Sequence, residues 1–495
     1  MGFHSNSIRP PQRRRPTAMD DTRLHSSSND QSQHLVLIGG GHAHVQVIRA
    51  LHSRPPSLRV TLIDQQAFAT YSGMVPGCIA GTYENPSETQ IDIAALAEWS
   101  GIEFRQNVVM DIDVDEKVVY LQDEDRQQQP TAIPFDVVSL DVGSTTRGWA
   151  ECPGAAEWTI PTRPIHELVH RLTTTASPPT QLVVLGGGMA GLELSLAAKG
   201  RWPDCHCVVL DAAADILPGE APSVRATVRS VFREKGVEIR QNCRVARVEQ
   251  HRLHLEMSSR MHADDDVVVP FSHCIWATGA GPSALLRKLH DQRGLACDSD
   301  GWVQVSSTLQ STSHPHVFAA GDCASVQAPK AGVYAVRAGP TLLTNLTLYL
   351  RKLKAAGEDT KVPPLIPYVP QDDFLKLVVC GDGTALGIRY GLVLRGPWVF
   401  RLKDAIDHDF LELFRVEGKA PSVGKTNQEG YEVAQYDDTP VQQEHIALEP
   451  REALALLLRT DDDVDFRVAQ RVLKRMQVDE AYRTDVLNGA VALIS

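Results

Sequence analysis

A strand, a glycine-rich turn and a helix follow one another twice in this chain, and no other feature limits the fold as strongly. In the first copy, an apolar run over 35–38 leads into Gly39, Gly40 and Gly41, and apolar residues then recur at helical spacing over 45–51. Glycines at 39 and 41 allow a tight turn and a close approach of the backbone to a pyrophosphate, whose charge the N–H groups at the start of the helix can meet. The pattern predicts a nucleotide-binding βαβ unit.

The second copy is more complete than the first. An apolar run over 182–185 precedes Gly186, Gly188 and Gly191, which form a full G-x-G-x-x-G, and a helical pattern continues to 197. In the first copy, the third glycine is replaced by His44, although a small residue at this position normally allows close packing of the helix on the strand.

An acidic residue ends the next apolar run in both copies. Asp64 follows 60–63 and Asp211 follows 208–210, each at the same distance from the second glycine of its motif. A carboxylate at the end of that strand can accept hydrogen bonds from an adenosine ribose. The two segments are therefore predicted to be repeats of one dinucleotide-binding unit.

Two later apolar runs each end in one glycine beside a polar residue, the first in Thr278-Gly279 and the second in Gly321-Asp322. With these segments, the chain resembles the two-dinucleotide-binding flavoproteins, which include the pyridine nucleotide disulfide reductases and the type II NADH dehydrogenases, over about residues 34–400. The resemblance implies that Gly39, Gly41, Asp64 and Asp322 bind FAD, and that Gly186, Gly188, Gly191 and Asp211 bind the nicotinamide cofactor. Further candidates for cofactor binding in or beside these motifs are His42, Thr278, Gly279 and Gly321.

A narrower resemblance rests on the glycine segment 39–47 together with Tyr71-Ser72-Gly73-Met74-Val75-Pro76-Gly77. These segments are similar to the flavoprotein module that is fused to some selenide, water dikinases. No dikinase domain follows here, so this resemblance implies an electron-transfer module and carries no prediction about selenium metabolism.

The family resemblance also implies the order of the domains. The expected fold is α/β, with two Rossmann-like domains, the second inserted in the first, and a C-terminal α+β region. A hairpin is expected over 375–394 and helices over 453–458 and 468–476. The expected ranges are a disordered segment 1–33, the two halves of the FAD domain at 34–154 and 273–360, the nicotinamide domain at 155–272, and a C-terminal region at 361–495.

Several residues are candidates for chemistry around the flavin. A helix that opens near Lys330 could turn its positive end to the flavin pyrimidine ring. Glu193 is expected in the first turn of the second-motif helix, where it either interacts favourably with the helix dipole or, as the resemblance to type II NADH dehydrogenases implies, delivers a proton to the acceptor. Asp211, followed by three alanines, favours NADH over NADPH.

Cysteine and histidine positions argue against two other chemistries. The family's disulfide reductases carry a pair of cysteines shortly after the first ribose acid, whereas only Cys78 occurs there. We expect a packed structural thiol. His42 and His44 fall on different faces of the helix start and have no second pair of ligands, so no metal site is predicted.

Charge and hydropathy limit the partners. The net charge of -12 and the absence of a basic stripe exclude nucleic acid as an expected partner. No apolar run approaches the roughly 20 residues that span a bilayer. Six apolar residues interspersed with acids could form a surface and leave peripheral membrane contact open: Trp398, Phe400, Ile406, Phe410, Leu413 and Phe414.

The sequence thus favours an FAD-dependent NADH dehydrogenase with a small-molecule acceptor, for which a quinone is the leading candidate. The alternative is a redox-responsive FAD- and NAD-binding protein that acts through a partner docked on 361–495. A homodimer or a monomer is expected. The expected compartment is the cytoplasm, with a mitochondrion or plastid as the alternative because the first 19 residues carry four arginines and no acid.

Overall fold

A five-stranded parallel sheet forms around the first glycine motif. The structure is a computed structural model that describes residues 32–122, 131–174, 177–256, 267–355, 361–416, 448–459 and 464–494. The strand order of the sheet is β21-β9-β1-β2-β5. The bounds are Val317–Ala319 (β21), Val137–Leu140 (β9), Gln33–Ile38 (β1), Leu58–Asp64 (β2) and Glu103–Gln106 (β5).

A second five-stranded parallel sheet repeats this arrangement around the second glycine motif, with the order β11-β18-β12-β13-β14. Both central strands, β1 and β12, are almost wholly buried, as expected for a parallel sheet that is covered on both faces. The bounds are Ile160–Pro161 (β11), His273–Trp276 (β18), Gln181–Leu185 (β12), His206–Leu210 (β13) and Val237–Arg240 (β14). The predicted pair of Rossmann-like units is confirmed.

Each parallel sheet is accompanied by a three-stranded antiparallel sheet. The first consists of β6 (Val109–Asp113), β7 (Val118–Leu121) and β8 (Ala132–Pro134). The second consists of β15 (Val245–Glu249), β16 (Arg252–Leu255) and β17 (Val268–Pro270). Three short two-stranded sheets are also present in the described residues: β3 (Phe68–Thr70) with β4 (Gln90–Asp92), β10 (Thr145–Thr146) with β19 (Ala280–Gly281), and β20 (Val303–Gln304) with β22 (Ala324–Ser325).

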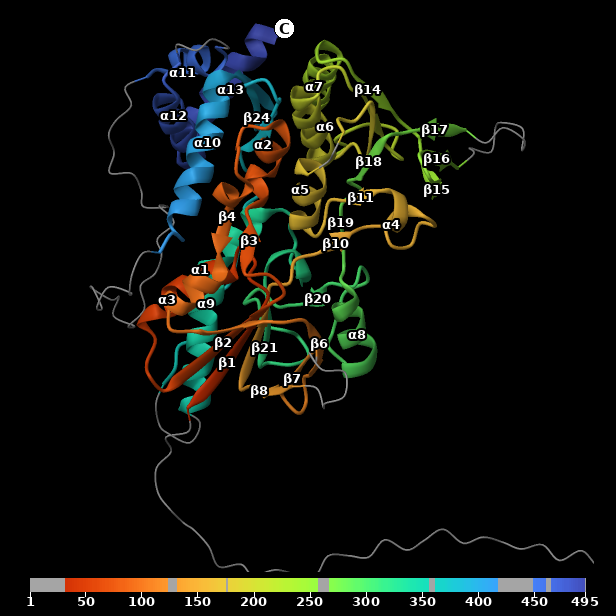
Figure 1. The fold of residues 1–495 in the computed structure, drawn as a ribbon. Helices are drawn as coiled ribbons and strands as arrows, with labels where there is room; N and C mark the ends of the chain where they lie inside the picture. Colours follow the sequence, from red (N-terminus) through yellow and green to blue (C-terminus); the bar gives the residue numbers. More distant parts are fainter. Residues whose placement is uncertain are drawn as a thin grey trace, which may run out of the picture.

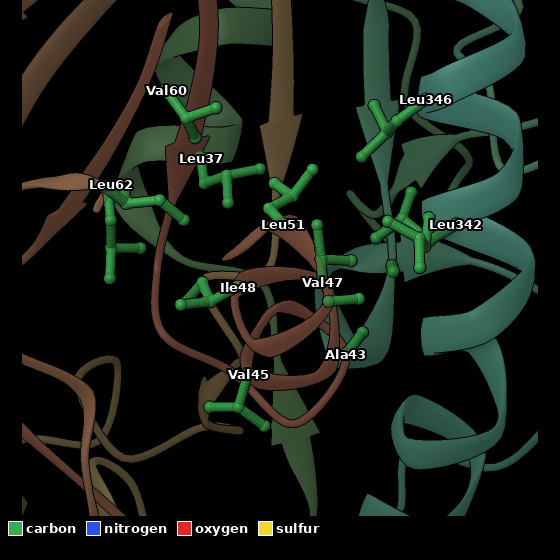
Figure 2. Close-up of a cluster of buried hydrophobic side chains, with 14 of the residues drawn as sticks. Leu37, Ala43, Val45, Val47, Ile48, Leu51, Val60, Leu62, Leu342 and Leu346 are labelled. Atoms are coloured by element: carbon green, nitrogen blue, oxygen red, sulfur yellow. The ribbon is translucent and has the colours of Figure 1, made fainter. Parts of the chain in front are cut away.

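Two helices from distant parts of the sequence pack together on the first sheet. Helix α1 (His44–Ala50) lies between strands β1 and β2 on one side and the long helix α9 (Gly332–Lys354) on the other, and its apolar side chains meet Leu342 and Leu346 of α9 (Figure 2). The predicted helix near Lys330 is therefore α9, which begins at Gly332. The other helices of this part are α2 (Val75–Ala80), α3 (Ile93–Trp99), α4 (Ala155–Trp158), α5 (Ile165–Thr173), α6 (Met189–Arg201), α7 (Pro222–Glu234) and α8 (Ala284–Arg293).

The C-terminal region forms an antiparallel sheet covered by helices. Strands β23 (Lys376–Val379), β24 (Ala385–Arg389) and β25 (Leu392–Gly396) extend the expected hairpin to three strands. This sheet packs on α6 and α7, and the helices α10 to α13 group at one end of the molecule (Figure 1). Their bounds are Pro397–Glu412 (α10), Pro450–Leu457 (α11), Phe466–Val478 (α12) and Glu480–Ile494 (α13). Both helices expected over 453–476 are confirmed.

The disorder predicted for residues 1–33 falls almost entirely outside the described residues, which begin at 32.

Candidate active site

The first glycine motif makes a turn that only glycine accommodates. Gly39 has a φ of +90°, and a Cβ there would overlap the carbonyl oxygen of Asp141. The next N–H, that of Gly40, donates to Asp64 Oδ2 at 2.6 Å. The motif and its predicted acidic residue therefore lie together at the carboxyl ends of the strands, the edge where open α/β sheets bind their ligands.

Asp141 is a site residue that the sequence analysis missed. It follows β9 directly, is 3% exposed, and its Oδ2 accepts from the N–H groups of Ala43 (2.9 Å) and His44 (3.0 Å). Burial raises the pKa of Asp141 to about 7. An acid directly after an apolar strand was the available signal, but only the pairing of β9 with β1 brings it to the motif.

His44 takes the place of the third glycine without opening the packing. Its Nδ1 lies 2.7 Å from the carbonyl oxygen of Gly39 and so carries the proton, while Nε2 lies 2.8 Å from Ser139 Oγ and accepts from it. Burial lowers the pKa of His44 to about 4. Among the described residues, no group of three His, Cys, Asp or Glu side chains is placed to hold a metal ion.

His42 points toward the region where the C-terminal part approaches the first motif. Its ring stacks on Phe410 with centroids 6.1 Å apart and tilts against Tyr71 at 5.4 Å. The buried Nε2 of His42 meets no hydrogen-bond partner in the described part of the chain. A buried polar atom of this kind normally has a partner, so the arrangement suits a bound cofactor that supplies one.

Gly321 and Asp322 reach the same edge of the first sheet. Gly321 has a φ of +65°, and Asp322 Oδ2 accepts from Ser144 Oγ at 2.7 Å and lies 3.5 Å from Arg163. Asp64 and Asp322 both raise the pKa of Asp141, although burial is the larger cause. Three carboxyl groups thus face one another around the first glycine motif.

The second motif makes the same turn, but Ala277 packs against its first glycine where Asp141 packs against Gly39. Gly186 has a φ of +115°, and a Cβ there would overlap the carbonyl oxygen of Ala277. The N–H of Gly187 donates to Asp211, as that of Gly40 does to Asp64. A Cβ at Gly191 would overlap the carbonyl oxygen of Gly186, which explains the third glycine of this copy.

A cavity of about 1270 Å³ extends from the second motif across to the C-terminal region. Pockets for one drug-sized ligand measure roughly 300–1,000 Å³, so this space suits more than one ligand ring system. Five of the six candidates of the second motif and its neighbouring loop line this cavity, and Gly191 does not. The lining includes Gly186, Gly188, Asp211, Thr278 and Gly279, together with Tyr71, Ser72 and Gly73.

Glu193 lines this cavity, but it does not lie where we expected it. Helix α6 begins at Met189, so Glu193 belongs to its second turn, and the expected interaction with the first turn of the helix is wrong. Instead, Glu193 Oε1 accepts from the N–H of Val379 in β23 at 2.8 Å. Burial raises the pKa of Glu193 to about 7, and the ammonium group of Lys403 opposes the shift.

A buried ion pair on α10 stands next to Glu193 and was also missed by the sequence analysis. Lys403 donates to Asp407 Oδ2 at 2.6 Å and to the carbonyl oxygen of Gly73. Burial raises the pKa of Asp407. Burial alone would lower the pKa of Lys403, but the carboxyl groups of Asp407 and Glu193 outweigh it, so the pKa of Lys403 is raised. The available signal was a lysine and an acid one helical turn apart in an apolar stretch.

Comparison with known proteins identifies the family. The sequence profile of the pyridine nucleotide-disulphide oxidoreductases matches residues 33–339. The chain belongs to this family. It is therefore an FAD-dependent NAD(P)H oxidoreductase with two dinucleotide-binding units, as the sequence analysis predicted.

Relatives of this oxidoreductase are distant in sequence. The Ferroptosis suppressor protein 1 of Homo sapiens is 27% identical over 304 residues, which cover 60% of this chain and 75% of that protein. A probable mitochondrial NADH-ubiquinone oxidoreductase of Schizosaccharomyces pombe is 23% identical over 60% of this chain and 59% of its own length. The structure of NDH2 from Plasmodium falciparum shares the fold, with a TM-score of 0.60 and 13% identity over 77% of this chain and 98% of that chain.

Cys78 lies where the disulfide reductases of the family would carry their cysteine pair. All nine cysteines of the oxidoreductase are free, and Cys78 is buried with its Sγ 3.4 Å from Thr89 Oγ1. Burial raises the pKa of the Cys78 thiol. This environment disfavours a reactive thiolate.

The six apolar residues considered for a membrane surface do not form one. Trp398, Phe410 and Phe414 are at most 4% exposed, and Phe400, Ile406 and Leu413 pack against the same interior clusters. The helices α11 to α13 cover one side of α10, a tertiary contact that the helical spacing did not reveal. No helix in the described ranges is both long and apolar enough to cross a membrane.

Proposed function

We propose that this oxidoreductase is an NADH dehydrogenase that passes electrons through FAD to a small diffusible acceptor, a quinone. The observation that carries the proposal is the position of Glu193, which stands in the wall of one cavity between the second glycine motif and the Lys403–Asp407 pair. The relatives support it, because one of them is a probable NADH-ubiquinone oxidoreductase.

The residues of the two motifs would hold the two nucleotides. Bound FAD supplies the chemistry of accepting a hydride and releasing electrons to the acceptor. We assign Gly39, Gly41, His42, Asp64, Gly321 and Asp322 to FAD. We assign Gly186, Gly188, Gly191, Asp211, Thr278 and Gly279 to the nicotinamide cofactor, with NADH preferred because Asp211 would repel a 2′-phosphate.

Glu193 is the candidate general acid and base for the acceptor. A pKa of about 7 lets its carboxyl group hold or release a proton near neutral pH. Lys403 stabilises the ionised form of Glu193 by its charge, and Asp407 keeps that ammonium group paired when Glu193 is protonated. The Val379 N–H fixes the orientation of the Glu193 carboxyl group.

Single-turnover kinetics of Glu193→Gln test this role. Flavin reduction by NADH should stay within a few-fold of the wild type, whereas reoxidation by a quinone should slow by at least about tenfold, because a general acid or base contributes about 10²- to 10⁴-fold. Glu234→Gln, the same change on the exposed surface of α7, is the control and should leave both steps unchanged. Unchanged reoxidation in Glu193→Gln would remove Glu193 from the mechanism.

The same experiment separates the enzyme from a redox-responsive binding protein. The enzyme reading requires that wild-type flavin bleaches with NADH and recovers rapidly with quinone. A binding protein that acts through a partner would bleach and then reoxidise slowly with every quinone tested.

We further infer that the nicotinamide domain, predicted over 155–272, is inserted between the FAD-domain halves predicted at 34–154 and 273–360. Because β18 (His273–Trp276) pairs with β12 in the second sheet, we extend the nicotinamide domain to residue 276. We also infer that the module is a relative of the one fused to some selenide, water dikinases. The segment that carries this narrower resemblance lies at the candidate active site, where the carbonyl oxygen of Gly73 accepts from Lys403 and Tyr71 hydrogen-bonds to Asp407. A homodimer or monomer, located in the cytoplasm or in a mitochondrion or plastid, stays a prediction.

A further inference from the structure

Asp141 and Ala277 hold equivalent positions in the two nucleotide-binding units. The N–H of Asp141 donates to Ile38, the residue before Gly39, and the N–H of Ala277 donates to Leu185, the residue before Gly186. The carbonyl oxygens of both residues stand against the first glycine of their motif. At this equivalent position, the FAD unit carries a carboxyl group where the nicotinamide unit carries a methyl group.

The Asp141 carboxyl group uses backbone donors that the FAD motif would otherwise offer to a phosphate. It takes the N–H groups of Ala43 and His44, and the N–H of Gly40 is bonded to Asp64. Within the described part of the chain, the N–H groups of Gly41 and His42 meet no acceptor. The Asp141 carboxyl group also lies so close to Gly41 and Gly321 that a Cβ at either position would overlap it.

The pyrophosphate of FAD carries two negative charges, and a phosphate bound at the first glycine motif would meet the buried Asp141 carboxyl group there. An ionised Asp141 would face the pyrophosphate across Gly41, with Asp64 and Asp322 adding like charge. Like charges in a buried site disfavour ionisation, so a proton on Asp141 relieves the conflict.

The other titratable groups around Asp141 do not supply that relief. His42 and His44 are neutral at pH 7, because burial lowers the pKa of each to about 4, and burial raises the pKa of Cys323 to about 12. The nearby basic side chains interact with other groups. Arg163 lies 3.5 Å from Asp322, and His166 lowers the pKa of Asp64. Lys330 donates to the carbonyl oxygen of Ala324 and lies near Asp322 and Cys323.

We propose that Asp141 is a positioning residue of the FAD site that must take up a proton when the pyrophosphate binds, so that flavin affinity falls as pH rises above neutrality. The inference rests on the assignment of FAD to the first motif. In the protonated form, the carbonyl oxygen of the Asp141 carboxyl group still accepts from the backbone, and Asp141 adds no negative charge beside the phosphate. The pKa of about 7 for this group places the change in a range where the protein can be studied.

The dissociation constant of FAD tests the proposal without any measurement of turnover. Holoenzyme is diluted at pH 6 and at pH 8.5, and released flavin is followed by its fluorescence. In the wild type, the dissociation constant should rise at least about tenfold between these pH values, since affinity coupled to one proton changes up to about tenfold per pH unit above the pKa. Binding at pH 8 should take up close to one proton per flavin.

Two substitutions at Asp141 give the matched comparison. Asp141→Asn keeps the acceptor and loses the charge, and Asp141→Ala copies Ala277; in both, the dissociation constant should be equal at the two pH values within about twofold. Glu193→Gln controls for the other cavity carboxyl group with a pKa of about 7 and should keep the wild-type pH dependence.

The results that would overturn the proposal are specific. A wild-type dissociation constant that is the same at both pH values, or no proton uptake by the wild type, would show that the protonation of Asp141 does not change when FAD binds. Full pH dependence in Asp141→Asn would show that another group takes up the proton. Asp64→Ala tests the underlying assignment separately. If it retains flavin fully, the FAD assignment itself fails; if it loses flavin while the wild type shows no pH dependence, only the role of Asp141 fails.

Discussion

At the first glycine motif, the middle glycine donates its N–H to Asp64, and at the second motif, the equivalent N–H goes to Asp211. The loops that follow the neighbouring strands differ, because Asp141 fills the first turn and Ala277 leaves the second one open. The third glycine differs as well, since His44 replaces it in the first unit. The comparison teaches that the two units share the turn and the acid at the end of the next strand, and that they differ in the loop packed against the turn.

The largest effect is expected at the third glycine of the second motif, Gly191, because the first unit carries His44 at the equivalent position. Gly191→Ala would push a Cβ into the carbonyl oxygen of Gly186 and should lower the free energy of unfolding by about 2 to 3 kcal/mol, the usual cost of overpacking. Gly188→Ala is the matched control, because its Cβ would meet no atom within 4 Å. Thermal unfolding compares the two; equal melting temperatures would show that the third glycine is not needed for packing.

An intermediate effect is expected for the choice of nicotinamide cofactor. Asp211 should favour NADH over NADPH by about 1 to 3 kcal/mol, or roughly 5- to 150-fold in kcat/KM, because a hydrogen bond to the 2′-hydroxyl is exchanged for repulsion of a phosphate. Asp211→Ser should bring the two donors closer together. Equal kcat/KM values for both donors in the wild type would contradict the role of Asp211.

The sequence was informative wherever the structure is local. The apolar runs before Gly39 and Gly186 predicted strands, and helical spacing after each motif predicted α1 and α6. Helices were also predicted at the positions of α9, α11 and α12. Asp141 escaped notice because its importance depends on the parallel pairing of β9 with β1, almost a hundred residues away. Lys403 and the bond from Val379 to Glu193 depend on how the C-terminal sheet packs on α6, a contact that periodicity does not encode.

The smallest effect concerns Ser144, which lies three residues after Asp141 in the loop that follows β9. Ser144 donates to Asp322 at 2.7 Å, whereas the corresponding residue of the second unit is Ala280, which has no hydroxyl group. Ser144→Ala should weaken FAD binding by about 1 kcal/mol, or about fivefold, through the loss of one hydrogen bond that orients Asp322. NADH binding should not change. Titration of flavin into both proteins measures the difference, and an unchanged flavin affinity would show that Ser144 does not orient Asp322 for the cofactor.

The central claim is that the two units hold different nucleotides, and reciprocal substitution of their ribose acids tests it most directly. Asp64→Ala and Asp322→Ala should purify with little flavin, because each loses a carboxylate at the edge of the first sheet. Asp211→Ala should keep its yellow flavin and lose most of its affinity for NADH, measured as the NADH concentration that gives half-maximal flavin bleaching. Full flavin occupancy in both Asp64→Ala and Asp322→Ala, or loss of flavin in Asp211→Ala alone, would contradict the account.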